Sequence, residues 1–199
     1  FISEQIDSIV SQSHSNWSLH ISDDDSSDGS NRIIKGYTKQ FAKKISINNV
    51  QNNDFRKSFL QLVCDKSIDS QYFSFADQDD IWEEDKLKVA LEFLQTIPED
   101  TPALFCSRTT IVDRDNQTLS LSPLFKRIPS FANALVQNIG GGNTMVFNLA
   151  AKRLLEKAGS DIEIPSHDWW TYMVVLGCGG KVFYDTNPYI RYRQHDANL

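Results

Sequence analysis

Hydrophobic residues recur every three or four positions in four segments of the first half of the chain, and a short apolar run follows each segment. The first segment shows the pattern clearly, because Ile2, Ile6, Ile9 and Val10 fall on one face of a helix. The spacing predicts helices around residues 2–10, 33–41, 55–63 and 87–94, and strands at 17–21, 44–48, 72–76 and 103–107. This alternation predicts an α/β fold with a mostly parallel sheet and crossover helices.

The second half of the sequence is less regular. It predicts a strand and turn at 111–116, a loop at 119–130, a strand at 144–147, helices at 149–158 and 168–176, and two short strands at 182–184 and 189–192. No internal repeat, linker or low-complexity segment divides the 199 residues. We therefore expect a single domain over residues 1–199.

The composition excludes several classes of protein. The net charge of -6 argues against nucleic-acid binding, which depends on Lys and Arg contacts with phosphates. The three cysteines, Cys64, Cys106 and Cys178, lie far apart and favour reduced thiols over disulfides or a zinc site. No apolar stretch approaches the roughly 20 residues that span a bilayer. These features predict a cytoplasmic protein and leave open a peripheral association with the inner face of the plasma membrane.

Two acidic clusters follow predicted strands. Asp77, Asp79 and Asp80 come after the run 72–76, and Asp23-Asp24-Asp25 comes after the run 17–21. Ligands of parallel α/β sheets bind at the carboxyl ends of strands, and clustered carboxylates suit Mg²⁺ or Mn²⁺. The pair of clusters thus predicts a nucleotide–metal site. The alternative is that each cluster caps a helix or forms a polar turn.

Three further motifs carry candidate chemistry, and each has a plainer structural alternative. His167-Asp168-Trp169-Trp170 offers a general base, or a capping aspartate beside core tryptophans. The run Gly140 to Asn143 allows close approach of the backbone to a ligand, or is a flexible loop. The segment Arg191 to His195 supplies the positive charge that a diphosphate needs, or is an exposed basic strand.

In their order and spacing, these motifs resemble the family 2 glycosyltransferases, particularly the rhamnosyltransferase-like members of bacterial surface-polysaccharide pathways. The resemblance rests on 21–30, 77–82, 142–148, 167–170 and 192–195, and it covers nearly the whole chain. It implies a GT-A fold, a Rossmann-like sheet flanked by helices, and inverting, metal-dependent transfer from a nucleotide-diphospho-sugar such as dTDP-rhamnose or a UDP-hexose. The expected acceptor is a glycan or a lipid-linked glycan.

The resemblance also implies roles for individual residues. Asp23 and Asp24 would hold the nucleoside. Asp77 and Asp79 would bind Mn²⁺ or Mg²⁺, with Asp77, Arg193 and His195 near the diphosphate, and Asp168 would be the catalytic base. The expected acceptor or sugar pocket comprises Gly142, Asn143, His167, Trp169 and Trp170.

The sequence departs from the family pattern in two places. Asp25 stands where the family usually has glycine. In addition, Phe1-Ile2-Ser3 resembles the segment that follows the first strand of the family, so we expect the first strand to be missing and the uncovered sheet edge to favour self-association. A nucleotidyltransferase and a non-catalytic sugar-nucleotide-binding fragment are the alternative functions.

Overall fold

The computed structural model describes residues 1–50 and 54–195. In chain order, the first half contains α1 (Ile2–Val10), β1 (Leu19–Asp23), α2 (Ser30–Gln40), β2 (Ile45–Asn49), α3 (Phe55–Cys64), β3 (Tyr72–Ser74), β4 (Ile81–Trp82) and α4 (Lys86–Leu94). The second half contains β5 (Ala103–Val112), β6 (Thr118–Leu121), α5 (Phe131–Ala134), the 3-10 helix η1 (Gly142–Thr144), β7 (Val146–Asn148), α6 (Leu149–Ala158), α7 (His167–Gly177) and β8 (Lys181–Arg193). The α/β class is as predicted.

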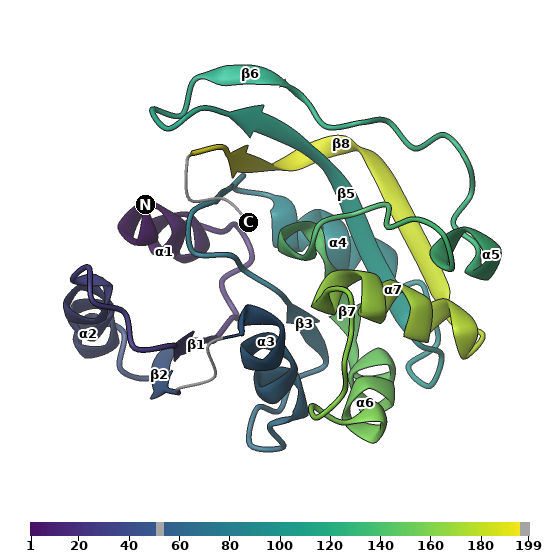
Figure 1. Ribbon diagram of the computed structural model, residues 1–199, viewed down its shortest axis with the longest axis horizontal. Coiled ribbons are helices and arrows are strands. Elements are labelled where there is room, and N and C mark those ends of the chain that lie inside the picture. Colours follow the sequence, from purple (N-terminus) through teal and green to yellow (C-terminus); the bar gives the residue numbers. More distant parts are fainter. Residues whose placement is uncertain (51–53, 196–199) are drawn as a thin grey trace.

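The strands form two sheets (Figure 1). A larger sheet has the order β3-β7-β5-β8-β4, with β6 paired to the outer end of β5, and a smaller sheet consists of β1 and β2. Only the pairs β1–β2 and β5–β8 are parallel among the described residues, and the other pairs are antiparallel. These two parallel ladders are the longest, with five and nine paired residues, whereas each antiparallel ladder has only two or three.

The core lies on both faces of the larger sheet. Side chains of a strand alternate between faces, and β5 shows this directly. Leu104 and Cys106 pack with α3, α6 and α7 on one face, whereas Ala103 and Phe105 pack with α4 on the other. A separate cluster built on Ile6, Ile34 and Ile45 supports the smaller sheet.

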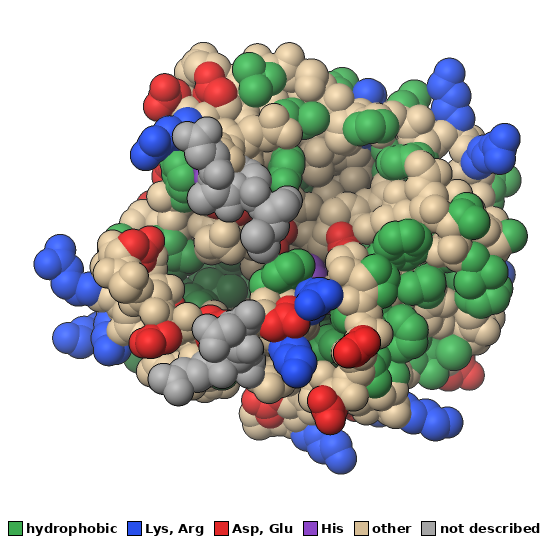
Figure 2. All heavy atoms as spheres, viewed as in Figure 1, with side chains coloured by type: hydrophobic (Ala, Val, Ile, Leu, Met, Phe, Trp, Pro, Cys, Tyr) green, Lys and Arg blue, Asp and Glu red, His purple; other side chains and the backbone are tan. Residues whose placement is uncertain are grey.

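A groove of about 1410 Å³ separates the two sheets. It is lined by α1, β1, α3 and β3, and Figure 2 shows a recess with hydrophobic side chains on this face. No strand bridges β1 and β3 within the described residues, so each presents one edge without a strand partner. Buried side-chain atoms of Gln5, Ser22 and Trp82, all at the groove, have no hydrogen-bond partner among the described residues.

Several local expectations were wrong. Residues 118–121, expected in a loop, form the exposed edge strand β6. Residues 181–193 form one long strand, in place of two short ones, because the pairing with β5 continues past Pro188 after a shift in register. Ile81 and Trp82, for which no strand was predicted, form the short strand β4 against β8. In the described part of the chain, no helix is long and apolar enough to cross a membrane.

Candidate active site

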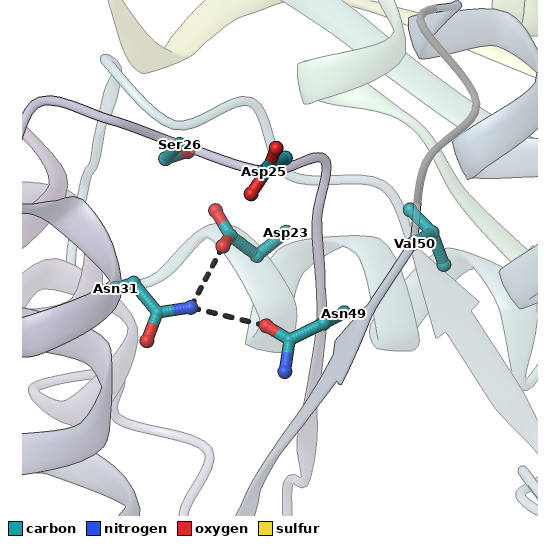
Figure 3. A pocket seen from close by; sticks show the side chains of 6 residues that line it. All are labelled: Asp23, Asp25, Ser26, Asn31, Asn49 and Val50. Atoms are coloured by element: carbon teal, nitrogen blue, oxygen red, sulfur yellow. Dashed lines mark hydrogen bonds between the residues drawn. The ribbon is translucent and has the colours of Figure 1, made fainter.

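The first acidic cluster lines a pocket at the end of β1 (Figure 3). The pocket has a volume of about 550 Å³, and its wall includes Asp23, Asp25, Asn31 and Asn49. Asp23 is buried, and its Oδ2 accepts a hydrogen bond of 2.8 Å from Asn31 Nδ2, which also lies 3.0 Å from Asn49 Oδ1. Amide and carboxylate groups arranged in this way can read the hydrogen-bonding edge of a base or a ribose.

The loop after β1 owes its shape to an unusual backbone conformation. Asp25 has φ +57°, in the left-handed region that favours glycine and tolerates aspartate. This is the position at which the sequence departs from the family pattern, so the aspartate keeps the conformation that a glycine would adopt. Asp24 is half-buried, lies beside the larger groove and does not line the smaller pocket.

The second acidic cluster lies between β3 and β4 and is largely buried. Asp79 Oδ2 lies 2.8 Å from His195 Nε2, so the loop lies beside the segment that follows β8. Asp80 is fully buried and accepts hydrogen bonds from the side-chain amide of Asn143 and from the backbone N–H of Arg193. Burial, opposed by the bond from Asn143, raises the pKa of Asp80 to about 6.

Asp77 lies close to several other carboxylates. Desolvation and the neighbouring carboxylates Asp80, Asp79 and Asp168 raise its pKa to about 7. Excess negative charge of this kind favours a bound cation, and hard carboxylate oxygens suit Mg²⁺ or Mn²⁺. Among the described residues no group of three or more His, Cys, Asp or Glu side chains is arranged to hold a metal ion. Asp77 and Asp79 alone are fewer ligands than Mg²⁺ or Mn²⁺ takes, so a metal site here would need further oxygen ligands from a bound substrate.

Arg193 lies in the interior of the site. Its guanidinium is 1% exposed and donates to the carbonyl oxygens of Asp79 and Arg114, at 2.9 and 2.6 Å, and to Glu4 Oε2 at 2.9 Å. Phe1 packs against this group and stacks on His195. These contacts make Arg193 a support for the acidic loop.

The residues Gly142 and Asn143 connect the acidic loop to α7. Asn143 binds Asp80, and the backbone N–H of Gly142 donates to Asp168 Oδ2 at 3.1 Å. A side chain at Gly142 would collide with His167, because an added Cβ would lie 2.4 Å from its Nε2. The absence of a side chain at Gly142 therefore lets the backbone approach His167 closely.

Asp168 lies in the first turn of α7 and is half-buried. Its Oδ1 accepts from the backbone N–H of Trp169 at 2.7 Å, one of the N–H groups of the first turn, whereas the N-cap position itself is Ser166. Its charge acts on both Asp77 and His167. A carboxylate held in this way, near the acidic loop, could accept a proton from an acceptor hydroxyl.

The three remaining aromatic residues of the motif are mainly packing groups. His167 is 4% exposed, stacks on Phe59 at 3.9 Å, and burial lowers its pKa to about 4. Trp169 Nε1 donates to the carbonyl of Ala134 at 2.6 Å, and Trp170 packs against the main core. All three lie next to Asp168. Among the described residues, their side chains make packing contacts and, for Trp169, one hydrogen bond to the backbone.

Sequence reasoning missed Lys86. This lysine is 1% exposed, its Nζ donates to Ser74 Oγ at 2.8 Å, and the same atom lies 3.3 Å from the centre of the Trp82 ring. It interacts with the charges of both Asp77 and Asp80, and burial lowers its pKa. No sequence signal pointed to this contact, because Trp82 lies in β4 and Lys86 begins α4, so helical spacing does not relate the two side chains.

Known proteins share both the sequence and the fold of this chain. Residues 1–155 match Glycosyl transferase family 2. The chain is 27% identical over 212 residues to the dTDP-rhamnosyl transferase RfbG of Shigella flexneri, covering 100% of this chain and 70% of that protein. A second relative, the Bacillus subtilis protein named putative teichuronic acid biosynthesis glycosyltransferase TuaG, is 32% identical over 97 residues, which are 47% of this chain and 36% of that protein.

Solved structures give the same fold. S. aureus TarS 1-349 in complex with UDP-GlcNAc superposes with a TM-score of 0.72 at 16% identity, covering 100% of this chain and 56% of that chain. The mannosyltransferase PcManGT of Pyrobaculum calidifontis, in complex with GDP-Man and Mn2+, superposes with a TM-score of 0.65 at 17% identity, covering 94% of this chain and 50% of that chain. The chain thus spans about half the length of these solved proteins. Its fold is GT-A, and the chain belongs to glycosyl transferase family 2, a family of glycosyltransferases.

Proposed function

We propose that this protein transfers a sugar from a nucleotide-diphospho-sugar to a glycan or lipid-linked glycan acceptor, with inversion at the anomeric carbon. The observation that best supports this proposal is a pair of hydrogen bonds from two adjacent residues. Asn143 donates to Asp80, and the backbone N–H of Gly142 donates to Asp168. These bonds hold a candidate base at a fixed place relative to the acidic loop. One site therefore has a carboxylate for the acceptor and an acidic loop for the donor diphosphate.

We infer a place for each substrate from this arrangement. The nucleoside would lie in the pocket of Asp23 and Asn31, and the diphosphate would reach toward Asp77 and Asp79. Mn²⁺ or Mg²⁺ bound by these two aspartates would neutralise charge on the leaving diphosphate. His195, hydrogen-bonded to Asp79, would orient that carboxylate. Arg193, which donates to the carbonyl oxygen of Asp79, would hold the loop in place.

In the reaction, Asp168 would accept the proton of an acceptor hydroxyl as the hydroxyl oxygen bonds to the anomeric carbon. The bond from that carbon to the diphosphate breaks on the opposite face, which inverts the configuration. No covalent enzyme intermediate is needed. The relatives support a dTDP-rhamnose or UDP-hexose donor, since one is a dTDP-rhamnosyl transferase and a solved neighbour binds UDP-GlcNAc. The name of TuaG supports a role in cell-surface polysaccharide synthesis.

A thermal-shift panel of nucleoside diphosphates, with Mn²⁺ or with EDTA, tests the donor and metal assignments together. A ligand at a hundredfold excess over its Kd stabilises by about 2.7 kcal/mol, which corresponds to roughly 5–10 °C for a domain of this size. We expect the larger shift with Mn²⁺. Equal shifts with Mn²⁺ and with EDTA would rule out a metal that bridges the diphosphate.

Matched variants locate the metal. Asp79→Asn should remove most of the metal-dependent part of the shift, because one ligand carboxylate becomes a neutral amide. Asp100→Asn, at an exposed position far along the chain, should leave it unchanged. If both variants respond like the parent protein, the cation binds elsewhere.

A further inference from the structure

An apolar patch lies on the surface around α5. It comprises Leu124, Ile128, Phe131, Leu135 and Val136, and three of these are largely exposed: Ile128 by 88%, Val136 by 75% and Leu135 by 59%. Figure 2 shows hydrophobic side chains gathered over α5 and α7 on the right, with Lys and Arg side chains above them. Soluble proteins rarely leave a continuous apolar surface of this kind open to water, and such a surface marks an interaction site.

The patch is held in place by specific hydrogen bonds. Ser130 Oγ accepts from the backbone N–H of Asn133 and so caps α5. Tyr172 on α7 donates to Asn133 Oδ1 at 3.0 Å, and Trp169 donates to the carbonyl of Ala134. The hydrophobic side chains are thus presented outward by a segment that is tied to the core.

The charge around the patch identifies its partner. Lys126 and Arg127 are both exposed beside Ile128. The sequence contains no Asp or Glu between Asp115 and Glu156, although the whole chain has a net charge of -6. A surface that combines apolar side chains with basic ones, and lacks acidic ones, complements an anionic lipid bilayer.

We propose that the patch docks this protein on the surface of an anionic membrane. Ile128 and Val136 would enter the boundary between headgroups and acyl chains, while Lys126 and Arg127 would contact lipid phosphates. Docking through α5 would also direct α7, which carries Asp168, toward the membrane, because α5 and α7 are joined by the bonds from Trp169 and Tyr172. Membrane docking by the patch does not depend on sugar transfer, so an experiment can refute either proposal while the other stands.

Vesicle sedimentation tests the proposal with the whole chain. Vesicles of phosphatidylcholine with about one third phosphatidylglycerol should bind the protein, and pure phosphatidylcholine should bind it far more weakly. Each basic side chain near an anionic surface increases binding about fivefold, so Lys126→Gln/Arg127→Gln should lose about 30-fold. Ile128→Ser/Val136→Ser should reduce binding to both vesicle types about tenfold or more.

Control variants separate the patch from general effects. Lys35→Gln/Lys39→Gln removes the same charge from exposed positions on α2, and Ile33→Ser removes an exposed isoleucine there. Both should bind vesicles within twofold of the parent protein. The proposal is overturned if the parent ignores anionic vesicles or if the patch variants bind as the controls do. It is also overturned if sedimentation equilibrium shows that the patch joins two copies of the chain.

Discussion

At the scale of residues, the site depends on a few buried polar contacts that join distant parts of the chain. Asn143 lies 63 positions from Asp80, yet their side chains are hydrogen-bonded. The carboxylates were predictable because they cluster locally at the ends of strands. Asn143 and Lys86 were not predicted as partners of these carboxylates, because their contacts arise only when β3, η1 and α4 come together.

The role of Asp168 can be tested by removing its charge alone. Asp168→Asn should lower the rate of sugar transfer by roughly 10²–10⁴, the range typical of a general base. The asparagine retains an oxygen that can accept from Gly142 N–H, so the binding of donor nucleotide should persist. Steady-state kinetics with calorimetric titration of the nucleotide distinguish the two effects. Near-normal turnover would identify Asp168 as a helix cap only.

His167 predicts a specific dependence of stability on pH. Its pKa is about 4 in the folded protein and near 6.5 in a model peptide, so between these values the unfolded chain binds a proton that the folded chain does not. As the pH falls through this window, His167 should lower the free energy of unfolding by up to about 1.4 kcal/mol per pH unit.

The variant His167→Gln isolates this contribution, because the raised pKa values of Asp77 and Asp80 act in the opposite direction in both proteins. Denaturant titrations at pH 7.5 and 5 give the free energies of unfolding. The difference between parent and variant should change with pH in favour of the variant at pH 5. Parallel pH profiles would show that His167 titrates normally.

At the scale of elements, the predictions succeeded where end signals and periodicity agree. Helix α6 begins at Asn148, whose side chain accepts from the backbone N–H of Ala151, and it ends at Gly159. The strands were harder to predict. Asp185 to Pro188 has the composition of a turn, yet β8 continues through it by an irregular register. Strand β6 alternates polar and apolar residues over only four positions, and all four are exposed, so the pattern is too short to distinguish this strand from a loop.

Two glycines offer a matched test of backbone conformation. Gly159 has φ +87° and ψ 172°, a region that only glycine occupies readily. Gly159→Ala should therefore destabilise the protein by about 1–3 kcal/mol, although no atom lies within 4 Å of an added Cβ. Gly36→Ala, within α2 and equally free of neighbours, should stabilise by about 0.5–1 kcal/mol. Urea denaturation measures both, and equal effects would contradict the assigned role of Gly159.

At the scale of the whole molecule, the open strand edges of β1 and β3 are the feature most exposed to other chains. Unpaired edges with apolar surroundings promote association between copies. We expect the 199-residue chain to self-associate as its concentration rises, with Ile21→Lys in β1 reducing association. Light scattering after size exclusion measures this, and Ile33→Lys on the exposed face of α2 is the control. A monomer at every concentration would refute the expectation.

The division into two sheets has a further consequence for affinity. The pocket proposed for the nucleoside lies at the ends of β1 and β2, whereas Asp79 follows β3 of the larger sheet and Asp168 lies on α7. No strand ladder among the described residues resists displacement of one sheet from the other. A donor that contacts both sheets would have to fix their relative position, and the free energy needed for this would reduce its net affinity. By thermodynamic linkage, a contact that stiffens the junction and tightens donor binding should itself be strengthened by the bound donor, by the same coupling free energy.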